Sequence, residues 1–290
     1  MFLFACQQYH QFLQLKESRI SVIKNKFLRL QKCTYIYFGF VLIFLFLGKS
    51  FAYGDSEDYS FEVQFGNIIV GKAEVSVISE EKKITVKAKT RTSGFLNTFY
   101  EYQGELISIS SKNKEVWKSY KFSTNGFFKN KSRFSELNWD EDNSVSYKID
   151  PVLDLKEVHD IDKSTLDNVI DPLTSIINVI ESIKNTETCD QSFKIFDGRR
   201  RYDFKIKSLG KENLKNDRPK SFSGNVTICG VKMIPIGGHR LKSKWKPKQD
   251  KFSDFKIYFG KTSSGLLFPV RMNLERWFGT VVVRLVNKNM

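Results

Sequence analysis

The clearest candidates for chemistry are the charged residues around a predicted turn at Asp197-Gly198. Arg199 and Arg201 follow that turn at alternate positions, so on a strand they would share one face. Arginine forks bind carboxylate or phosphate groups in bidentate fashion, which makes both side chains candidate ligands for an anion. The structural alternative is that these charges keep an exposed hairpin soluble and guard an edge strand.

A second candidate is a tryptophan surrounded by lysines. Lys244, Trp245 and Lys246 lie in a stretch, 242–251, that has five lysines in ten positions. Tryptophan is amphipathic and lysines attract anionic headgroups, so this segment could contact a membrane surface. The alternative is a solvated loop whose tryptophan folds back onto the core.

The sequence offers little for catalysis or metal binding. It contains no H-E-x-x-H or G-x-S-x-G motif and no phosphate-binding G-x-x-x-x-G-K-[ST] loop. His159 and His239 lie 80 positions apart, and a solvated turn accounts for His159 and the aspartates beside it. We predict no catalytic residue, no metal site and no cofactor. A Ser-His-Asp triad stays open, since its members need not be close in sequence.

The N-terminal 52 residues have the pattern of an export signal. Residues 33–48 carry no formal charge, a basic stretch precedes them, and Ser50-Phe51-Ala52 offers small residues for cleavage after Ala52. We therefore expect a periplasmic protein with a cleaved signal peptide at 1–52, of which 1–23 fit a mis-assigned gene start. An uncleaved membrane anchor at about 33–48 is the alternative.

Export changes the meaning of the charge and of the cysteines. Seven of the 47 basic and one of the 32 acidic residues lie in 1–52, so the formal charge falls from +15 to about +9. An exported chain rarely meets nucleic acid, which leaves lipid headgroups or an anionic envelope polymer as partners. Cys189 and Cys229 remain and are predicted to form a disulfide, with two buried free thiols as the alternative.

The elements that must position these residues are mostly strands. Alternating apolar residues predict strands around 59–65, 73–77, 84–88, 116–122, 134–139 and 144–149, and again from 193 to the C-terminus. One amphipathic helix is predicted at about 171–185, with Asp171 as N-cap and Pro172 at its first position. The fold class is therefore mainly β, an antiparallel meander forming a barrel or strongly curved sheet with this helix packed against it. Residues 53–290 are expected to form a single domain; two subdomains meeting near 151–190 are the alternative.

The order of several short motifs resembles a known family. The motifs are Val70-Gly71, Thr92 to Phe95, Asp171 to Leu173, Asp197 to Tyr202, Cys229 and Phe268 to Arg271. In this order the chain resembles the bacterial domain-of-unknown-function family numbered 3108. The resemblance implies an exported, mostly β envelope protein with no established activity, and it carries over no catalytic residue.

These observations predict a non-catalytic protein of the cell envelope that binds a lipid or another anionic component, or acts as an accessory factor. A curved sheet with a helix across it can leave an apolar cleft for an acyl chain. An envelope hydrolase or glycan-modifying enzyme is one alternative. A protein-interaction module that uses an exposed strand edge is the other.

Overall fold

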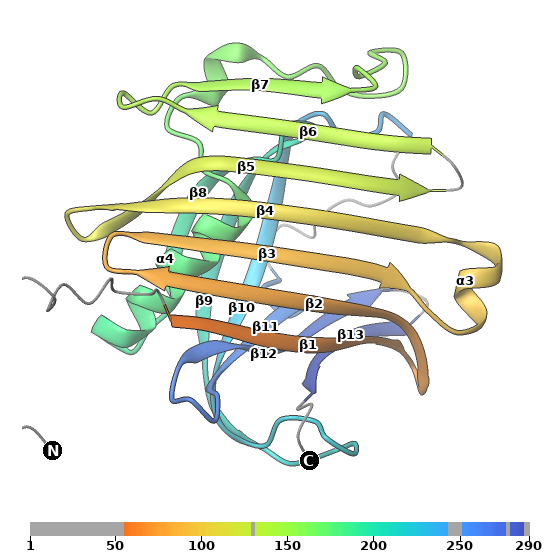
Figure 1. Ribbon diagram of the computed structural model, residues 1–290, viewed down its shortest axis with the longest axis vertical. Helices are drawn as coiled ribbons and strands as arrows, with labels where there is room; N and C mark the ends of the chain where they lie inside the picture. The colour runs from red at the N-terminus through yellow and green to blue at the C-terminus, as the bar shows by residue number, and fades with distance from the viewer. Residues whose placement is uncertain (1–54, 129–130, 243–250, 277–278, 287–290) are drawn as a thin grey trace, which may run out of the picture. The chain divides into compact units, whose positions relative to one another are not determined.

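The computed structural model describes residues 55–128, 131–242, 251–276 and 279–286, which form one 13-stranded sheet (Figure 1). The strands are β1 (Asp55–Phe65), β2 (Ile68–Glu80), β3 (Lys83–Thr92), β4 (Tyr102–Asn113), β5 (Val116–Phe128), β6 (Lys131–Trp139), β7 (Val145–Asp150), β8 (Gln191–Phe196), β9 (Arg201–Leu214), β10 (Gly224–Gly237), β11 (Phe255–Lys261), β12 (Leu267–Arg276) and β13 (Gly279–Val286). The helices are α3 (Phe95–Phe99), the 3-10 helix η1 (Lys163–Leu166) and α4 (Pro172–Thr186). The predicted signal peptide, with Ala52 and the apolar stretch 33–48, lies outside the described residues.

The sheet consists of two antiparallel meanders, β1 to β7 and β8 to β13. They join where the first strand, β1, pairs with the last, β13. The strand order ends at β7 on one side and at β8 on the other, so the ladder of the described strands is not closed. Figure 1 shows β1 to β7 as one layer with β8 to β12 passing behind it. The predicted mainly β class is confirmed, in its strongly curved, open form.

Side chains connect the two layers across the concave face of the sheet. One core cluster combines Phe61 of β1 and Trp117 of β5 with Val226 of β10. At the open edges the rings of Tyr147 on β7 and Phe196 on β8 meet edge to face, with their centroids 4.9 Å apart. Apolar packing therefore brings together the two edges that no backbone ladder joins.

Helix α4 lies between the two layers, where it contacts β4 and β5 on one side and β8 and β12 on the other (Figure 1). Its bounds agree with the predicted 171–185, and Asp171 is its N-cap as expected. Ile177 packs into the cluster that contains β1 and β5, whereas Val179 and Ile183 pack into the cluster around β8 to β11. A helix that is apolar toward two layers is buried between them.

The buried carboxylate of Asp171 fixes the N-terminus of α4. It accepts hydrogen bonds from the backbone N–H of Leu173 at 2.9 Å and of Thr174 at 3.1 Å. It also accepts from Ser108 Oγ at 3.0 Å and from Ser119 Oγ at 2.6 Å, and Ser119 Oγ accepts from the Asp171 N–H at 2.8 Å. The cap therefore belongs both to the helix and to strands β4 and β5.

Strand β4 is not predicted by the sequence pattern, and this network explains why. Ser108 and Ser110 face the interior and are buried, whereas Ile107 on the opposite face is exposed. The usual alternation is inverted because the hydroxyls bond to the helix: Ser108 to Asp171, and Ser110 to Thr174 Oγ1 at 2.7 Å. A prediction that looks for apolar residues at alternate positions therefore does not identify β4, because serines occupy its inward positions.

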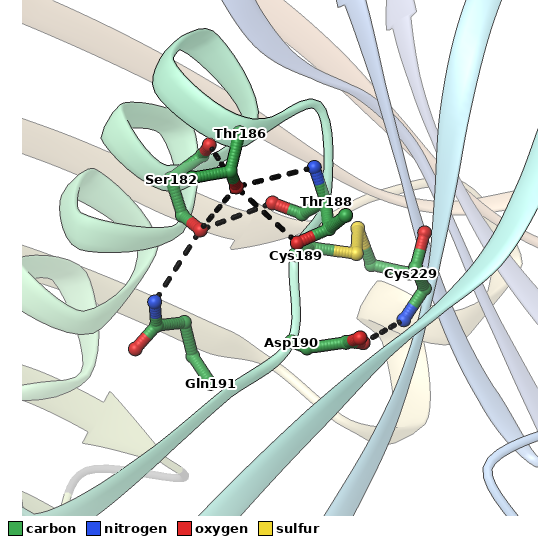
Figure 2. Close-up of a disulfide and its surroundings, with 8 residues drawn as sticks. Ser182, Thr186, Thr188, Cys189, Asp190, Gln191 and Cys229 are labelled. Atoms are coloured by element: carbon green, nitrogen blue, oxygen red, sulfur yellow. Dashed lines mark hydrogen bonds between the residues drawn. A yellow bond between two sulfur atoms is a disulfide. The ribbon is translucent and has the colours of Figure 1, made fainter.

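The predicted disulfide between Cys189 and Cys229 is present (Figure 2). Both residues are fully buried, and their Cα atoms are 6.2 Å apart. Cys189 follows the C-terminal end of α4, and Cys229 lies in β10. The bond closes a loop of 40 residues and anchors the segment between α4 and β8 to the second meander.

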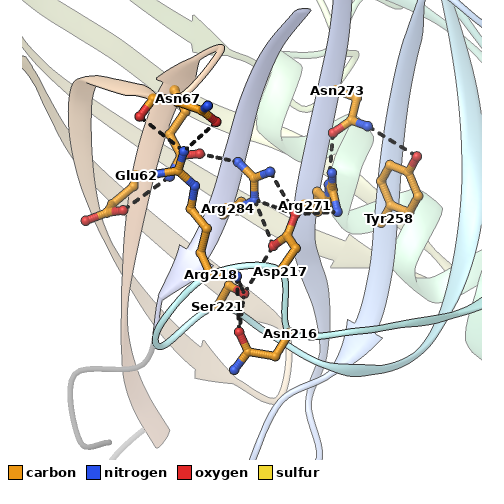
Figure 3. Close-up of polar contacts among 11 residues, drawn as sticks. Glu62, Asn67, Asn216, Asp217, Arg218, Ser221, Tyr258, Arg271, Asn273 and Arg284 are labelled. Atoms are coloured by element: carbon orange, nitrogen blue, oxygen red, sulfur yellow. Dashed lines mark hydrogen bonds and ion pairs between the residues drawn. The ribbon is translucent and has the colours of Figure 1, made fainter.

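An ion cluster reinforces the junction of the two meanders (Figure 3). The carboxylate of Asp217 lies 2.8 Å from Arg284 Nη2 on β13 and 3.3 Å from Arg271 Nη1 on β12. Arg218 donates to the carbonyl of Asn67, between β1 and β2, at 3.1 Å. Burial opposes the ionisation of Asp217, but the two arginines outweigh it and hold the pKa of Asp217 below its ordinary value.

We expect Asp171→Ala to lower the free energy of unfolding by about 3 kcal/mol, because it removes a helix cap and leaves buried hydroxyls without an acceptor. The matched control is Asp162→Ala, since Asp162 is exposed and caps η1 by accepting from the Ser164 N–H. That substitution should cost much less than Asp171→Ala, because water can replace the hydrogen bond that the exposed Asp162 accepts. Urea unfolding measures both, and equal losses would contradict the role given to the buried network.

Candidate ligand-binding cleft

A cleft of about 600 Å³ lies on the concave face beyond the N-terminus of α4. One wall comes from the inward faces of β3 to β6, and the other from the loop between β8 and β9 and from Tyr202. Pro172, the first residue of α4, also lines it. The cleft therefore begins where the helix stops filling the space between the layers.

The sheet wall of the cleft is aromatic, and two glycines in it leave room for an aromatic ring. Gly104 and Gly126 are opposite each other in the β4–β5 register, and both line the cleft. A Cβ on Gly104 would lie 2.3 Å from Tyr102 Oη, so the tyrosine occupies the space that a side chain there would take. Tyr100 and Phe128 continue the wall, with ring centroids 4.2 Å apart. This side can accept an apolar chain.

Arg199 forms the polar side of the cleft. Its Nη2 donates to the backbone carbonyls of Asp150 at 2.6 Å, Pro151 at 2.9 Å and Phe134 at 3.3 Å. Its Nε is buried and makes no hydrogen bond to the described residues. The same is true of Ser135 Oγ, which also lines the cleft. Two residues that line one cavity thus carry buried polar atoms with unused hydrogen-bonding capacity, and each such atom costs free energy until it is satisfied.

The cleft has an excess of positive charge. Arg133, Lys131 and Arg240 line it together with Arg199. The two carboxylates on its walls are already engaged: Glu105 pairs with Lys89 at 3.2 Å, and Asp197 pairs with Arg200 at 2.9 Å. Burial and the neighbouring Arg133 lower the pKa of Arg199, and the opposing charges of Asp197 and Asp150 only partly offset them.

The loop that carries Arg199 is held by Asp197. Pairing between β8 and β9 stops at Phe196 and Arg201, so the loop has four residues, 197–200, instead of the predicted two-residue turn. The Asp197 carboxylate accepts from the N–H groups of Arg199 at 3.0 Å and Arg200 at 2.7 Å. These bonds favour the longer loop, and they place Arg199 off the strand, against the cleft.

His159 and His239 are paired through their backbones, next to Gly238, which contacts this loop. The N–H of His159 donates to the carbonyl of His239, and the N–H of Gly238 donates to the carbonyl of His159, both at 2.8 Å. Burial and the nearby Arg200 lower the pKa of His239. In the described part of the chain, no group of three or more metal-ligating side chains comes together.

The structure separates the residues that the sequence singled out. Arg199 lies in the cleft, whereas Arg201 is buried elsewhere and donates to the carbonyl of Thr165 at 2.9 Å and to Asp203 at 2.8 Å. The two therefore do not share one face. Lys244, Trp245 and Lys246 lie outside the described residues.

Sequence reasoning missed the other contributors to the cleft, notably Tyr102, Arg133 and Ser135. The glycines opposite each other in β4 and β5 are a signal that could have pointed to this wall, because glycine within a strand marks a close approach.

A larger hollow of about 1160 Å³ lies at the C-terminal end of α4, but its chemistry is less specific. Its walls include Lys211 and Glu187, which pair with each other at 2.7 Å. None of its described lining residues carries a buried polar atom without a partner. The cleft at the N-terminal end of α4 is therefore the better candidate for a ligand site, although its volume is smaller.

Within the described ranges, no helix combines the length and the hydropathy that crossing a bilayer requires.

The fold and the cleft define an open, curved β-sheet protein with an internal helix and a cationic, aromatic-walled cavity. The family model described as "Protein of unknown function (DUF3108)" matches residues 60–286, so the chain belongs to this family, as its motifs suggested. No curated protein matches the chain. Among solved structures, a β-barrel-like protein of domain of unknown function DUF1849 from Brucella abortus is similar. It has 11% sequence identity and a TM-score of 0.46, and the match covers 80% of this chain and 95% of that one.

We expect Gly238→Ala to displace the loop that carries Arg199. Gly238 has a φ of +74°, and a Cβ there would lie 1.9 Å from the carbonyl oxygen of Arg199. Backbone strain costs roughly 1 kcal/mol, and the overlap should add about 2 kcal/mol or more.

Gly265→Ala is the control for Gly238→Ala, because Gly265 has a φ of +84° with no atom within 4 Å of the added Cβ. It should lose about 1 kcal/mol in the same unfolding assay, from strain alone. If both variants lose the same amount, the close packing at Gly238 does not hold the loop.

Proposed function

We propose that this protein is a non-catalytic binding protein of the cell envelope whose ligand is an anionic amphiphile, an acyl chain that ends in a carboxylate or phosphate. The observation that carries the proposal is that one cleft has an aromatic wall and is also lined by Arg199 and Ser135, whose Nε and Oγ atoms have no hydrogen-bond partner among the described residues. A ligand oxygen would satisfy both atoms, and the chain would lie along Tyr102 and Phe128.

The size and charge of the cleft support this ligand class. About 600 Å³ lies within the range of small-molecule sites. Lys131, Arg133 and Arg240 would add attraction for an anionic head, since no carboxylate on the described walls remains free to neutralise them.

A location outside the cytoplasm is part of the proposal. It rests on the leader pattern in residues 1–52 and on the disulfide, a bond that persists in oxidising compartments. In the envelope such a protein would meet acidic lipids and lipid-derived acids directly.

We expect Arg199→Gln to weaken the binding of hexadecanoate roughly tenfold or more, because a hydrogen bond to a charged group contributes about 1.5–3 kcal/mol. Lys205→Gln is the control, since it removes one positive charge from an exposed position on β9. Titration of a fluorescent fatty acid and its displacement by hexadecanoate measure the affinities, with thermal unfolding as a check that each variant folds.

A second variant tests the part of the cleft that would hold the acyl chain of the ligand, separately from the part that would hold its anionic head. Thr124→Trp would put a large ring into the cleft, from a strand residue that lines it, and should block binding with Arg199 intact. Unchanged affinity in both the Arg199→Gln and Thr124→Trp variants would exclude this cleft as the site, and so would a wild-type protein that binds no acidic amphiphile.

A further inference from the structure

An exposed aromatic edge lies beside the cleft, and most of its side chains have no part in the proposed function. Helix α3 carries Phe95 and Phe99, which are 75% and 60% exposed and whose ring centroids lie 4.9 Å apart. Tyr100 follows directly, and Phe127 at the end of β5 is also exposed. We call Phe95, Phe99, Tyr100 and Phe127 the aromatic rim. Figure 1 shows α3 at the end of the layer formed by β2 to β5.

Helix α3 has little internal reason to fold. It has five residues, none of them buried, and its N-cap, Gly94, makes no side-chain hydrogen bond. Thr92 Oγ1 donates to Asn97 Oδ1 at 2.7 Å, which ties the helix to the end of β3. A helix this short is marginal in water by itself, and adjacent exposed phenylalanines are typical of a surface that meets an apolar partner.

The rim is continuous with the cleft. The ring of Tyr100 packs on Phe128, with centroids 4.2 Å apart, and both side chains line the cleft. Tyr102 comes next on the same wall. An apolar chain could therefore move from the rim to Arg199 along aromatic side chains.

Cations flank the rim. Arg91 precedes Thr92 at the end of β3 and is exposed, and Lys131, which pairs with Phe128 in the β5–β6 register, and Arg133 are exposed on β6. Glu101 and Asp150 are acidic residues at this end that enter no described ion pair, so the three cations outnumber them, whereas Glu105 is paired with Lys89. Aromatic side chains bordered by Lys and Arg are the composition that binds the interface of an anionic bilayer.

From this geometry we infer that the aromatic rim docks the protein on an anionic phospholipid bilayer, with the mouth of the cleft facing the lipid. The inference rests on the proposed function for its purpose, since the membrane would be the source or the destination of the amphiphile. It makes Thr92 to Phe95, a motif singled out in the sequence, part of the docking surface.

The test is co-sedimentation of the folded protein with vesicles of phosphatidylglycerol and phosphatidylcholine. The Phe95→Ser/Phe99→Ser variant should lose at least tenfold in partitioning to these vesicles. Val116→Ser/Tyr120→Ser is the matched control, because these two exposed residues lie at the opposite end of β5. It should bind as the wild type does. Arg91→Gln/Lys131→Gln should weaken binding to the anionic vesicles more than binding to pure phosphatidylcholine.

Equal partitioning of the rim and control variants would overturn the inference. A wild-type protein that forms dimers in solution and ignores vesicles, with a monomeric rim variant, would also overturn it and would assign the rim to a second copy of this chain. Displacement of the fluorescent fatty acid in the same samples, without vesicles, keeps the two proposals apart. The rim variant should retain that affinity, whereas a loss in Arg199→Gln reports on the cleft alone.

Discussion

The rest of the structure depends on one buried carboxylate. Asp171 is fully excluded from solvent, yet it is matched by two N–H groups of α4 and by the hydroxyls of Ser108 and Ser119 on β4 and β5. A buried charge is tolerated only where donors surround it, so the carboxylate fixes where the helix begins and which strands it faces. The positive end of the helix dipole favours the same arrangement.

From that anchor the architecture follows. The helix occupies the space between the two layers from Asp171 onward, and the disulfide at Cys189 anchors the chain after its other end (Figure 2). The Asp217 cluster fixes the junction of the two meanders (Figure 3). Among the described elements, no helix covers the concave face beyond Pro172. The β8–β9 loop and the aromatic wall of β4 and β5 enclose that region as the cleft.

Much of the fold could be predicted from local pattern. Asp171-Pro172 and the amphipathic pattern after it identified α4, and the alternating apolar residues at 59–65 and 73–77 identified β1 and β2. Local sequence pattern did not predict elements whose inward side chains are determined by contacts with residues far away in the sequence. Strand β4 turns serines inward because they bond to a helix more than 60 residues away. Of the candidate site only Arg199 was identified, as a ligand for an anion, but it was expected on a strand face shared with Arg201 and lies in a loop. Its partners in the cleft, on β4 to β6, come from pairing that no short motif records.

The account's central claim is that the cleft beyond α4 binds an acidic amphiphile with its head at Arg199. A crystal structure of the protein grown with hexadecanoate tests it most directly. The account predicts the carboxylate within hydrogen-bonding distance of Arg199 Nε and Ser135 Oγ, with the chain along Tyr102 and Phe128. Hexadecanoate bound in the hollow at the other end of α4, with this cleft empty, would contradict it.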